Sequence, residues 1–483
     1  MNRVVLCAVI ALASAASADP CANALVTLED GAVVNVEWPV RSAAELHGRA
    51  LANATLEIEY TLALRADGSV ASASWTSRTS DGKPTPGQLV VPAGAVFWSD
   101  RLPSTLEQIV LRARAGHLAT VPLVASSKDV PTQATVASID ANNWTVTLGP
   151  RSYDVVLDDG GCMVAATLAS YGITFERRAM AERAVESTYG APPDAPYTAT
   201  DVKIATPAGH VLAGTLTRPR TTKRMPAVVM ITGISKHERN EGMPPYTPFR
   251  DIADVLGRAG IAVLRVDDRG IGASTGDFDK ATSFNEADDV RSELAWLRKQ
   301  PGLDPKRVGL VGHSEGGFIA LVVAATDPAI AAIAILAGSG VPGEQLNSWQ
   351  TVQTVDHDPT VPAEKRAETI RKLLADRSDW TPRDTAFVAA DPADYAKRVR
   401  APVLILQGGN DLHVPPRSPE RLVATLRAAG NRDVTARIIP QLSHTLCPDI
   451  IGSLQAWSWL PSRRLSNALL EDLQGWLVHE LAP

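Results

Sequence analysis

The feature that most constrains the fold of this chain is a strand, a tight turn and a helix in direct succession. The apolar, β-branched run Arg307–Val311 is typical of a buried strand. It leads into Gly-His-Ser-Glu-Gly, in which Ser314 stands between Gly312 and Gly316. Residues 317–326 are mostly small and apolar and are predicted to form a helix. Because larger side chains at the two glycines would collide where strand and helix cross, the pattern predicts a serine exposed on a sharp turn.

Two further residues complete the chemistry that such a serine needs. A serine hydroxyl is a poor nucleophile unless a base takes its proton, and the base needs a carboxylate to fix its tautomer. Asp411 follows the apolar run Val403–Gln407, and His444 follows the run Val434–Ile439. Each residue alone is a common turn or loop residue. In the order Ser314, Asp411, His444, at the carboxyl ends of strands, they predict a catalytic triad.

The region around these residues has the pattern of an α/β domain. From about residue 197 to 483, short apolar runs alternate with helical stretches, which predicts a mostly parallel sheet covered by helices on both faces. Residues 341–400 interrupt the alternation and are expected to form an inserted helical cap. Four aromatic residues of this cap either pack within it or line a pocket: Trp349, Trp380, Phe387 and Tyr395.

The part of the chain before this domain has a different pattern. Residues 19–190 contain several short runs that alternate apolar and polar residues, separated by turn signals. They predict an antiparallel sheet, a sandwich or a half-barrel around a helix at 104–113. Residues 191–196 are rich in proline and are expected to be a linker. No chemical motif indicates what the β-rich domain does.

The start of the chain resembles a cleavable export signal. Residues 1–18 have a basic start, an apolar middle and small residues before an expected cleavage that leaves Asp19 first. No later run is long enough to span a bilayer, so we expect a periplasmic or extracellular protein without a transmembrane segment. A formal net charge of −6 gives no reason to expect a nucleic acid partner.

The cysteines are few once the signal is removed. Cys21, Cys162 and Cys447 remain, an odd number for an oxidising compartment. We slightly favour a disulfide between Cys21 and Cys162, since both lie in the N-terminal region, but the pairing stays open. Cys447 is close to His444, and a small buried residue is the favoured interpretation over a catalytic one. No metal-ligand spacing occurs, and neither a metal nor a cofactor is expected.

Several motifs together carry a resemblance to a known superfamily. They are residues 228–233, residues 268–276, the sequence His-Ser-Glu-Gly-Gly at 313–317, and residues 408–415. With them, residues 197–483 resemble an α/β-hydrolase-fold serine hydrolase. Within that superfamily the chain is similar to bacterial secreted esterases of the dienelactone-hydrolase and acyl-esterase type. It is more distantly similar to prolyl-oligopeptidase-like peptidases.

This resemblance implies an oxyanion hole made of two backbone N–H groups. One belongs to Glu315, the residue after the nucleophile, and the other to the loop after residue 233. Ile234 is the expected donor there, although related enzymes often carry a small residue at that position, and Ser235 is the alternative. The resemblance also implies that residues 267–269 brace a turn, and His237 is expected to be a solvated loop residue.

The expected function is therefore hydrolysis of carboxylic esters with small or short acyl groups, with a small-molecule ester as the partner. Three alternatives stay open: a serine peptidase of the prolyl-oligopeptidase-like branch, an acyl-thioester hydrolase, and a non-catalytic envelope-binding protein. A complete triad disfavours the last of these. The sequence does not indicate the oligomeric state or the identity of the acyl and alcohol groups.

Overall fold

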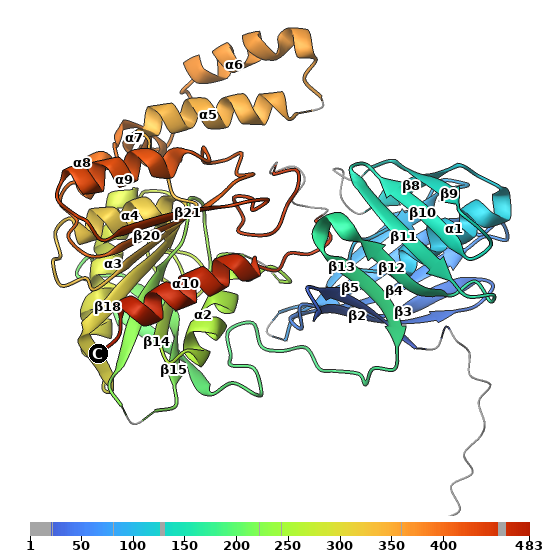
Figure 1. The fold of residues 1–483 in the computed structure, drawn as a ribbon, viewed down its shortest axis with the longest axis horizontal. Coiled ribbons are helices and arrows are strands. Elements are labelled where there is room, and N and C mark those ends of the chain that lie inside the picture. Colours follow the sequence, from blue (N-terminus) through green and yellow to red (C-terminus); the bar gives the residue numbers. More distant parts are fainter. Residues whose placement is uncertain are drawn as a thin grey trace, which may run out of the picture.

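The computed structural model describes residues 21, 23–80, 82–125, 131–221, 223–242, 244–358, 360–452 and 460–483. The predicted export signal at residues 1–18 lies outside these residues. Two domains lie side by side along the long axis of the molecule, one dominated by strands and one mixed (Figure 1). The segment between them, residues 179–196, forms neither helix nor strand. The irregular connection therefore begins earlier than the predicted linker at 191–196.

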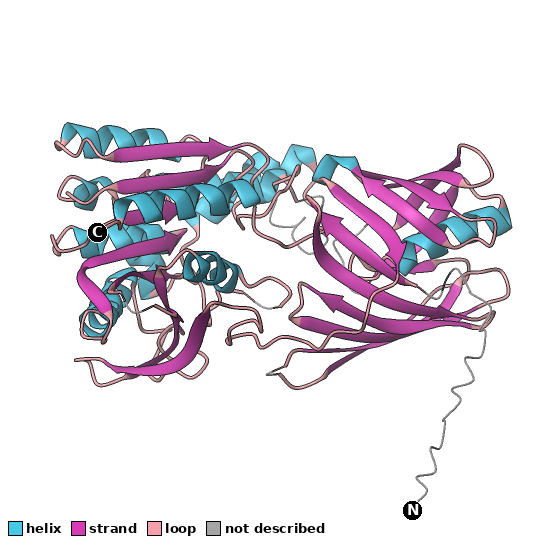
Figure 2. Cartoon of the chain, turned by 60° about the horizontal axis from the view of Figure 1, so that its bottom comes forward, coloured by secondary structure: helices cyan, strands magenta, loops and turns pink. Residues whose placement is uncertain are grey.

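The first domain is one large, curved, mainly antiparallel sheet of 13 strands (Figure 2). The order is β6-β5-β4-β3-β2-β1-β13-β12-β11-β10-β9-β8-β7, so that the first and last strands of the domain pair with each other. The strands are β1 (Ala24–Glu29), β2 (Ala32–Arg41), β3 (Glu45–Ala52), β4 (Leu56–Leu64), β5 (Val70–Arg78), β6 (Thr85–Val90), β7 (Val96–Trp98), β8 (Thr120–Ala125), β9 (Gln133–Ser138), β10 (Asn143–Leu148), β11 (Arg151–Leu157), β12 (Met163–Leu168) and β13 (Ile173–Arg178).

A single helix, α1 (Ser104–Gly116), packs against both halves of this sheet. Its Glu107 accepts a hydrogen bond from Arg41 of β2 at 2.7 Å and another from the Met163 amide of β12 at 2.7 Å. The same carboxylate pairs with Arg177 of β13 at 2.8 Å. The helix thus fills the inside of the curved sheet, in keeping with the predicted β-rich domain around a helix.

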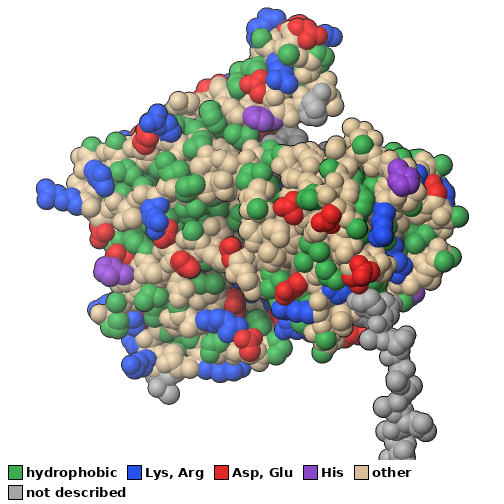
Figure 3. All heavy atoms as spheres, turned by 45° about the vertical axis from the view of Figure 1, so that its right-hand side comes forward, with side chains coloured by type: hydrophobic (Ala, Val, Ile, Leu, Met, Phe, Trp, Pro, Cys, Tyr) green, Lys and Arg blue, Asp and Glu red, His purple; other side chains and the backbone are tan. Residues whose placement is uncertain are grey.

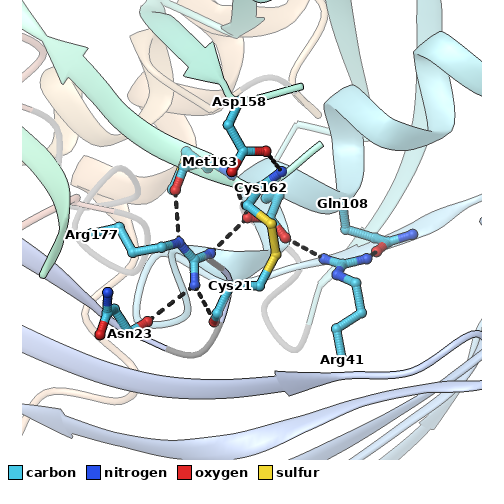
Figure 4. Close-up of a disulfide and its surroundings, with 9 residues drawn as sticks. Cys21, Asn23, Arg41, Gln108, Asp158, Cys162, Met163 and Arg177 are labelled. Atoms are coloured by element: carbon cyan, nitrogen blue, oxygen red, sulfur yellow. Dashed lines mark hydrogen bonds and ion pairs between the residues drawn. A yellow bond between two sulfur atoms is a disulfide. The ribbon is translucent and has the colours of Figure 1, made fainter. Parts of the chain in front are cut away.

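The disulfide favoured from the sequence is present. Cys21 and Cys162 are joined, with 5.5 Å between their Cα atoms. The side chain of Arg177 lies beside the bridge and donates to the backbone oxygens of Cys21, Asn23 and Met163 (Figure 4). The bridge and this arginine hold the start of the described chain to β12 and β13. Cys447 is free and buried, as expected.

The second domain contains an eight-stranded sheet of mixed direction. Its order is β14-β15-β17-β16-β18-β19-β20-β21, in which β14, β15 and β17 are antiparallel neighbours and the remaining pairs are parallel. The strands are β14 (Tyr197–Ala205), β15 (Val211–Pro219), β16 (Met225–Ile231), β17 (Ala262–Val266), β18 (Leu303–His313), β19 (Ile333–Leu336), β20 (Val403–Gly408) and β21 (Val434–Ile439). With the antiparallel β domain before it, this arrangement confirms the predicted fold class.

Helices cover both faces of this sheet (Figure 1). Adjacent strand residues point to opposite faces, so Val228 of β16 packs with α2 (Pro248–Arg258) and α10 (Asn467–Glu480). Its neighbour Val229 packs with the helices on the other face, which are α3 (Ser283–Leu297), α4 (Glu315–Ala324) and α9 (Ser418–Ala428). The nearly continuous apolar runs seen in the sequence result from this burial on two sides.

The insertion at residues 341–400 is helical. Between β19 and β20 lie α5 (Gly343–Asp356), α6 (Arg366–Ala375), α7 (Pro382–Ala389) and α8 (Ala393–Ala396). The α5–α6 pair projects from the body of the molecule, and α6 has no buried residue (Figure 1). On the face shown in Figure 3, acidic and basic side chains are interspersed without a large patch of one sign. In the described part of the chain, no helix is both long and apolar enough to cross a membrane.

Candidate active site

The predicted serine lies at the junction of β18 and α4. Ser314 has φ 52° and ψ −117°, a left-handed conformation that non-glycine residues adopt rarely and mainly at functional sites. A Cβ atom on Gly312 would collide with the backbone of Gly316, and one on Gly316 would collide with the carbonyl of Ile231. The two glycines are therefore required by the close crossing of helix and sheet, as predicted from the sequence.

The structure brings Ser314, His444 and Asp411 into one hydrogen-bonded chain. The Nε2 atom of His444 is 3.1 Å from the hydroxyl oxygen of Ser314, and its Nδ1 atom is 2.9 Å from Oδ2 of Asp411. All three residues are buried, and Asp411 is fully inaccessible. This geometry suits a serine whose proton passes to a histidine that a carboxylate orients.

Asp411 is held as a carboxylate by several donors. Its Oδ1 accepts the backbone N–H groups of His413 at 2.8 Å and Val414 at 2.7 Å, and its Oδ2 accepts the Gln407 amide at 2.8 Å. Burial alone would raise the pKa of Asp411, but the charge of His444 and these hydrogen bonds lower it below its usual value. An ionised Asp411 keeps the Nδ1 proton of His444 in place.

Both predicted oxyanion residues line the same cavity as Ser314. Glu315 is the first residue of α4, so its N–H is among the amides at the helix start that have no acceptor within the helix. Ile234 lies in the loop that follows β16. Ser235, the alternative donor, is not among the described residues that line this cavity. Ile234 and Glu315 thus both lie beside the nucleophile, as the predicted oxyanion pair requires.

A cavity of about 790 Å³, including its mouth, opens above Ser314. Its floor is formed by the ends of the sheet, and its roof is formed by α5 and α7 of the insertion. The walls are mainly apolar, from Ile234, Phe318, Val341, Leu346, Trp380, Phe387, Val388 and Val414. Of the four cap aromatics, Trp380 and Phe387 line the cavity. The indole of Trp349 donates to the Leu412 carbonyl at 3.2 Å, and Tyr395 packs against Phe318.

Both carboxylic acids that line the cavity already have partners. The carboxylate of Glu315 accepts from Ser283 and lies 3.2 Å from Arg383. Asp384 caps α7, and its Oδ2 accepts from the backbone N–H and the hydroxyl of Thr381 at 2.8 and 2.6 Å. Glu315 is therefore paired with a cation, whereas Asp384 accepts from the neutral donors of Thr381. In the residues that the structure describes, no cluster of histidine, cysteine, aspartate and glutamate has metal-binding geometry.

A buried arginine joins the cap to the nucleophile turn. Arg383 of α7 pairs with Glu286 of α3 at 2.6 Å and with Glu315 at 3.2 Å, and its guanidinium lies 4.2 Å from the Phe278 ring centre. Burial and the nearby Glu286 carboxylate raise the pKa of Glu315 to about 7, against the lowering effect of Arg383. No pattern in the sequence indicates this contact, because its partners lie far apart in the chain.

The residues at 267–269 brace the turn after β17, as the resemblance implied. Asp267 accepts from Arg239 at 2.8 Å, and Arg269 pairs with Asp289 at 2.7 Å. Asp268 accepts from the backbone N–H of His237 at 2.8 Å. The interpretation of His237 as a solvated loop residue is wrong, since its ring nitrogen Nε2 also lies 2.8 Å from the carbonyl of Ile234.

Two histidines that sequence reasoning did not assign to the site lie against His444. The ring centres of His413 and His313 are 4.6 and 5.0 Å from that of His444. Burial and the charge of His444 lower the pKa of His413 to about 3, so that its ring is neutral. His313 is the residue before the nucleophile, and its position in the motif was the one available signal.

Comparisons with known proteins agree with this geometry. Residues 208–445, just under half of the chain, match the family model of the X-Pro dipeptidyl-peptidases of the S15 family. The chain is 23% identical over 277 residues to the esterase EstD of Thermotoga maritima, covering 55% of this chain and 65% of EstD. It is 27% identical over 264 residues to an uncharacterized peptidase, YuxL, of Bacillus subtilis, covering 51% of this chain and 35% of YuxL.

The chain therefore spans less than two thirds of the length of these relatives. Among solved structures, the α/β hydrolase GrgF from Penicillium is similar, with a TM-score of 0.42 and 18% identity. The match covers 59% of this chain and 99% of GrgF. The family match lies within the second domain, and the relatives include an esterase and an uncharacterized peptidase.

Proposed function

Since the chain is a serine hydrolase with an α/β-hydrolase domain and has relatives of ester-cleaving and peptide-cleaving type, we propose that it cleaves carboxylic esters through a Ser314–His444–Asp411 triad. The observation that carries the proposal is the continuous hydrogen-bonded chain from Asp411 through His444 to Ser314, which ends at the floor of an apolar cavity. A serine so placed is an activated nucleophile beside a space that a substrate can fill.

The mechanism follows from the positions of these atoms. The Ser314 oxygen attacks the ester carbonyl carbon while its proton passes to Nε2 of His444. The negative charge that develops on the carbonyl oxygen is stabilised by the N–H groups of Ile234 and Glu315. Collapse of this intermediate breaks the bond to the alcohol oxygen, which takes the proton from Nε2. A water molecule then repeats the sequence on the acyl-enzyme and releases the acid.

Two features favour an ester over a peptide substrate. Recognition of a free peptide amino terminus needs an acid that faces the substrate. Of the two acids at the cavity, Glu315 is already paired with the cation Arg383, and Asp384 accepts from Thr381 through Oδ2. An amine is also a poorer leaving group than an alcohol, so an amide needs more help than this site provides. The S15 family match makes a dipeptidyl-peptidase activity the second candidate.

The walls of the cavity favour a neutral, mainly apolar substrate. Trp380 and Phe387 come from the cap and Phe318 from α4, so a ring or branched group on the substrate would contact aromatic surface on two sides. Ile234 projects its side chain from the oxyanion loop and restricts the space for the acyl group. We therefore assign a small or short acyl group and an alcohol, aromatic in the favoured case, that the cap encloses.

Export to the periplasm or the extracellular space is part of this proposal. It is supported by the signal-like residues 1–18 and by the Cys21–Cys162 disulfide, since such bonds persist mainly in oxidising compartments. The mature protein would begin at Asp19. Mass determination of the exported protein tests this, and an unprocessed N-terminus in the cytoplasm would contradict it.

The function is tested by a rate series. We expect kcat/KM for p-nitrophenyl esters to be highest for short acyl chains and to fall as the chain lengthens. Alanyl-prolyl and aminoacyl anilides, measured under the same conditions, should react more slowly than the matched esters. A maximum at long chains would instead indicate a lipase, and faster cleavage of the alanyl-prolyl anilide would indicate the dipeptidyl-peptidase.

A further inference from the structure

Glu241 is a buried glutamate in the loop between β16 and α2, which also carries Ile234 and which we call the oxyanion loop. It is not part of the triad, but it contacts Gly233 and His313 beside the triad. Glu241 is 5% exposed and has a left-handed backbone, with φ 54°, which is unfavourable for a glutamate. Its Oε1 accepts the backbone N–H of Gly233, the residue before Ile234. Its other carboxylate oxygen, Oε2, is buried without a hydrogen-bond partner among the described residues. A charged, strained and incompletely satisfied side chain of this kind indicates a functional constraint.

The second partner of Glu241 is His313, the residue before the nucleophile. The Nδ1 atom of His313 lies 3.0 Å from Oε1 of Glu241. Its Nε2 atom lies 2.9 Å from the backbone carbonyl oxygen of His444. Nδ1 is not aligned for a hydrogen bond with Oε1. An unprotonated Nδ1 would, however, direct its lone pair at a carboxylate oxygen 3.0 Å away, so an ionised Glu241 favours a ring that carries protons on both nitrogens, with Nε2–H donated to the His444 carbonyl.

The charges around His313 support this protonation state. Burial alone would lower its pKa, but Glu241 and the His444 carbonyl raise it above its ordinary value, with a smaller contribution from Asp411. The rings of His444 and His413 face it across the site, and His413 is neutral. The anions around His313 therefore outweigh the cations.

Gly233 lies close to both Glu241 and the nucleophile Ser314. A Cβ atom at this position would lie 3.1 Å from Oε1 of Glu241 and 3.2 Å from the Cβ atom of Ser314. Glycine is thus needed for the oxyanion loop to approach the nucleophile and the glutamate together. The contact leaves little freedom for the neighbouring Ile234 amide.

We propose that Glu241 and a doubly protonated His313 act as a pair of positioning residues that fix the relative positions of the three loops of the active site. Glu241 fixes the oxyanion loop through Gly233, His313 belongs to the nucleophile turn, and its Nε2–H holds the loop that carries His444. Neither residue touches the reacting atoms. The inference rests on the proposed triad and oxyanion hole and adds the residues that align them.

The test compares Glu241→Gln and His313→Asn with the wild-type enzyme. Each variant should lower kcat about 10- to 100-fold while KM changes little, because small misplacements of reacting groups cost rate rather than binding. The inhibition constant of a boronic acid that mimics the tetrahedral intermediate should rise in proportion to the loss of kcat/KM. Glu238→Gln, at an exposed position of the same loop, serves as the matched control and should keep wild-type values of all three.

A measurement that needs no substrate separates this inference from the ester assignment. NMR of wild-type protein with ¹⁵N-labelled histidine should show both His313 nitrogens protonated at neutral pH, and the signal should change in Glu241→Gln. His313→Asn assigns the resonance. A neutral His313 in the wild-type enzyme would overturn the proposal, as would wild-type kcat and inhibitor affinity in a correctly folded Glu241→Gln variant. Failure of ester hydrolysis alone would overturn only the proposed substrate.

Discussion

Replacement of Arg383 by methionine is the most informative perturbation of the cap. The side chain is almost fully buried, and its guanidinium lies between the carboxylates of Glu286 and Glu315. Methionine fills similar space without the charge, so the variant leaves two buried acids without their cation. Because one of these acids belongs to Glu315, whose N–H we propose for the oxyanion hole, the change should affect both the stability and the active site.

The expected magnitude follows from the protonation of these acids. Removal of one partner from a buried ion pair costs about 3 to 5 kcal/mol when the remaining charge stays ionised. The pKa of Glu315 is raised to about 7, so its neutral form is already available near neutral pH. At pH 8 Glu315 is mainly ionised, so both acids contribute to the cost. We expect about 3 kcal/mol, the lower end of that range, because Glu315 can take up a proton when its cation is lost. With about 2 to 4 °C per kcal/mol for a domain of this size, the Tm should fall by about 6 to 12 °C.

The dependence on pH has a definite sign. A carboxyl group whose pKa is raised on folding destabilises the protein as pH rises through that value, and loss of Arg383 strengthens this effect for Glu315. The difference in Tm between wild type and Arg383→Met should therefore be small at pH 5 and largest at pH 8.

Calorimetry at pH 5 and pH 8 measures this difference in Tm. The effect on the active site is measured separately, as KM for a short-chain ester. Glu286→Gln in the Arg383→Met background should recover part of the lost stability at pH 8. Arg371→Met, an exposed arginine of α6, is the matched control and should leave the Tm unchanged. Equal Tm values for Arg383→Met and wild type at pH 8 would refute the reasoning, and so would a larger difference at pH 5 than at pH 8.

Three further predictions concern the triad, the disulfide and a buried acid. Ser314→Ala and His444→Ala should each reduce kcat by about 10⁵- to 10⁶-fold, and the double variant should be no worse, because the residues act as a unit; near-wild-type activity in a folded Ser314→Ala would refute the mechanism. Cys162→Ser removes a disulfide between residues 141 positions apart and should lower the free energy of unfolding by about 4 kcal/mol in urea titrations. As the control, wild type treated with reductant should show the same decrease in the free energy of unfolding. Burial raises the pKa of Glu37 to about 7 from an ordinary 4.5, so the free energy of unfolding of the wild type should fall by about 3 kcal/mol as pH rises from 4.5 to above 7. Glu37→Gln should remove that dependence on pH, and a variant whose stability changes with pH in parallel with the wild type would contradict this.

The parts of the fold that the sequence predicted are those encoded by local patterns. The strand, turn and helix around Ser314 follow from apolar runs and two glycines, and the positions of Asp411 and His444 follow from the strands that precede them. The order of three residues at strand ends was enough to place them together. The helix at 104–113 could also be predicted, since the spacing of its apolar residues differs from that of the strands on either side.

The parts that escaped prediction depend on contacts between distant segments. Arg383 and Glu286 are 97 positions apart, and nothing in the spacing of either residue indicates the other. Glu241 lies in an irregular loop whose path is set by its contacts rather than by periodicity. His237 appeared to be solvated for the same reason, because its acceptor is a backbone carbonyl that the sequence cannot position.

The oxyanion loop is also one of the places where the two domains meet, which links the β domain to the active site. The Asn53 side chain of the turn after β3 donates to the Pro245 carbonyl at 3.0 Å. The Asn240 side chain donates to the Thr188 carbonyl, in the irregular segment between the domains, at 3.0 Å. Both contacts lie in the same loop as Glu241 and Ile234. Besides the turn after β17, which holds Arg239 and His237, this loop therefore has contacts with the β domain on one side and with His313 on the other.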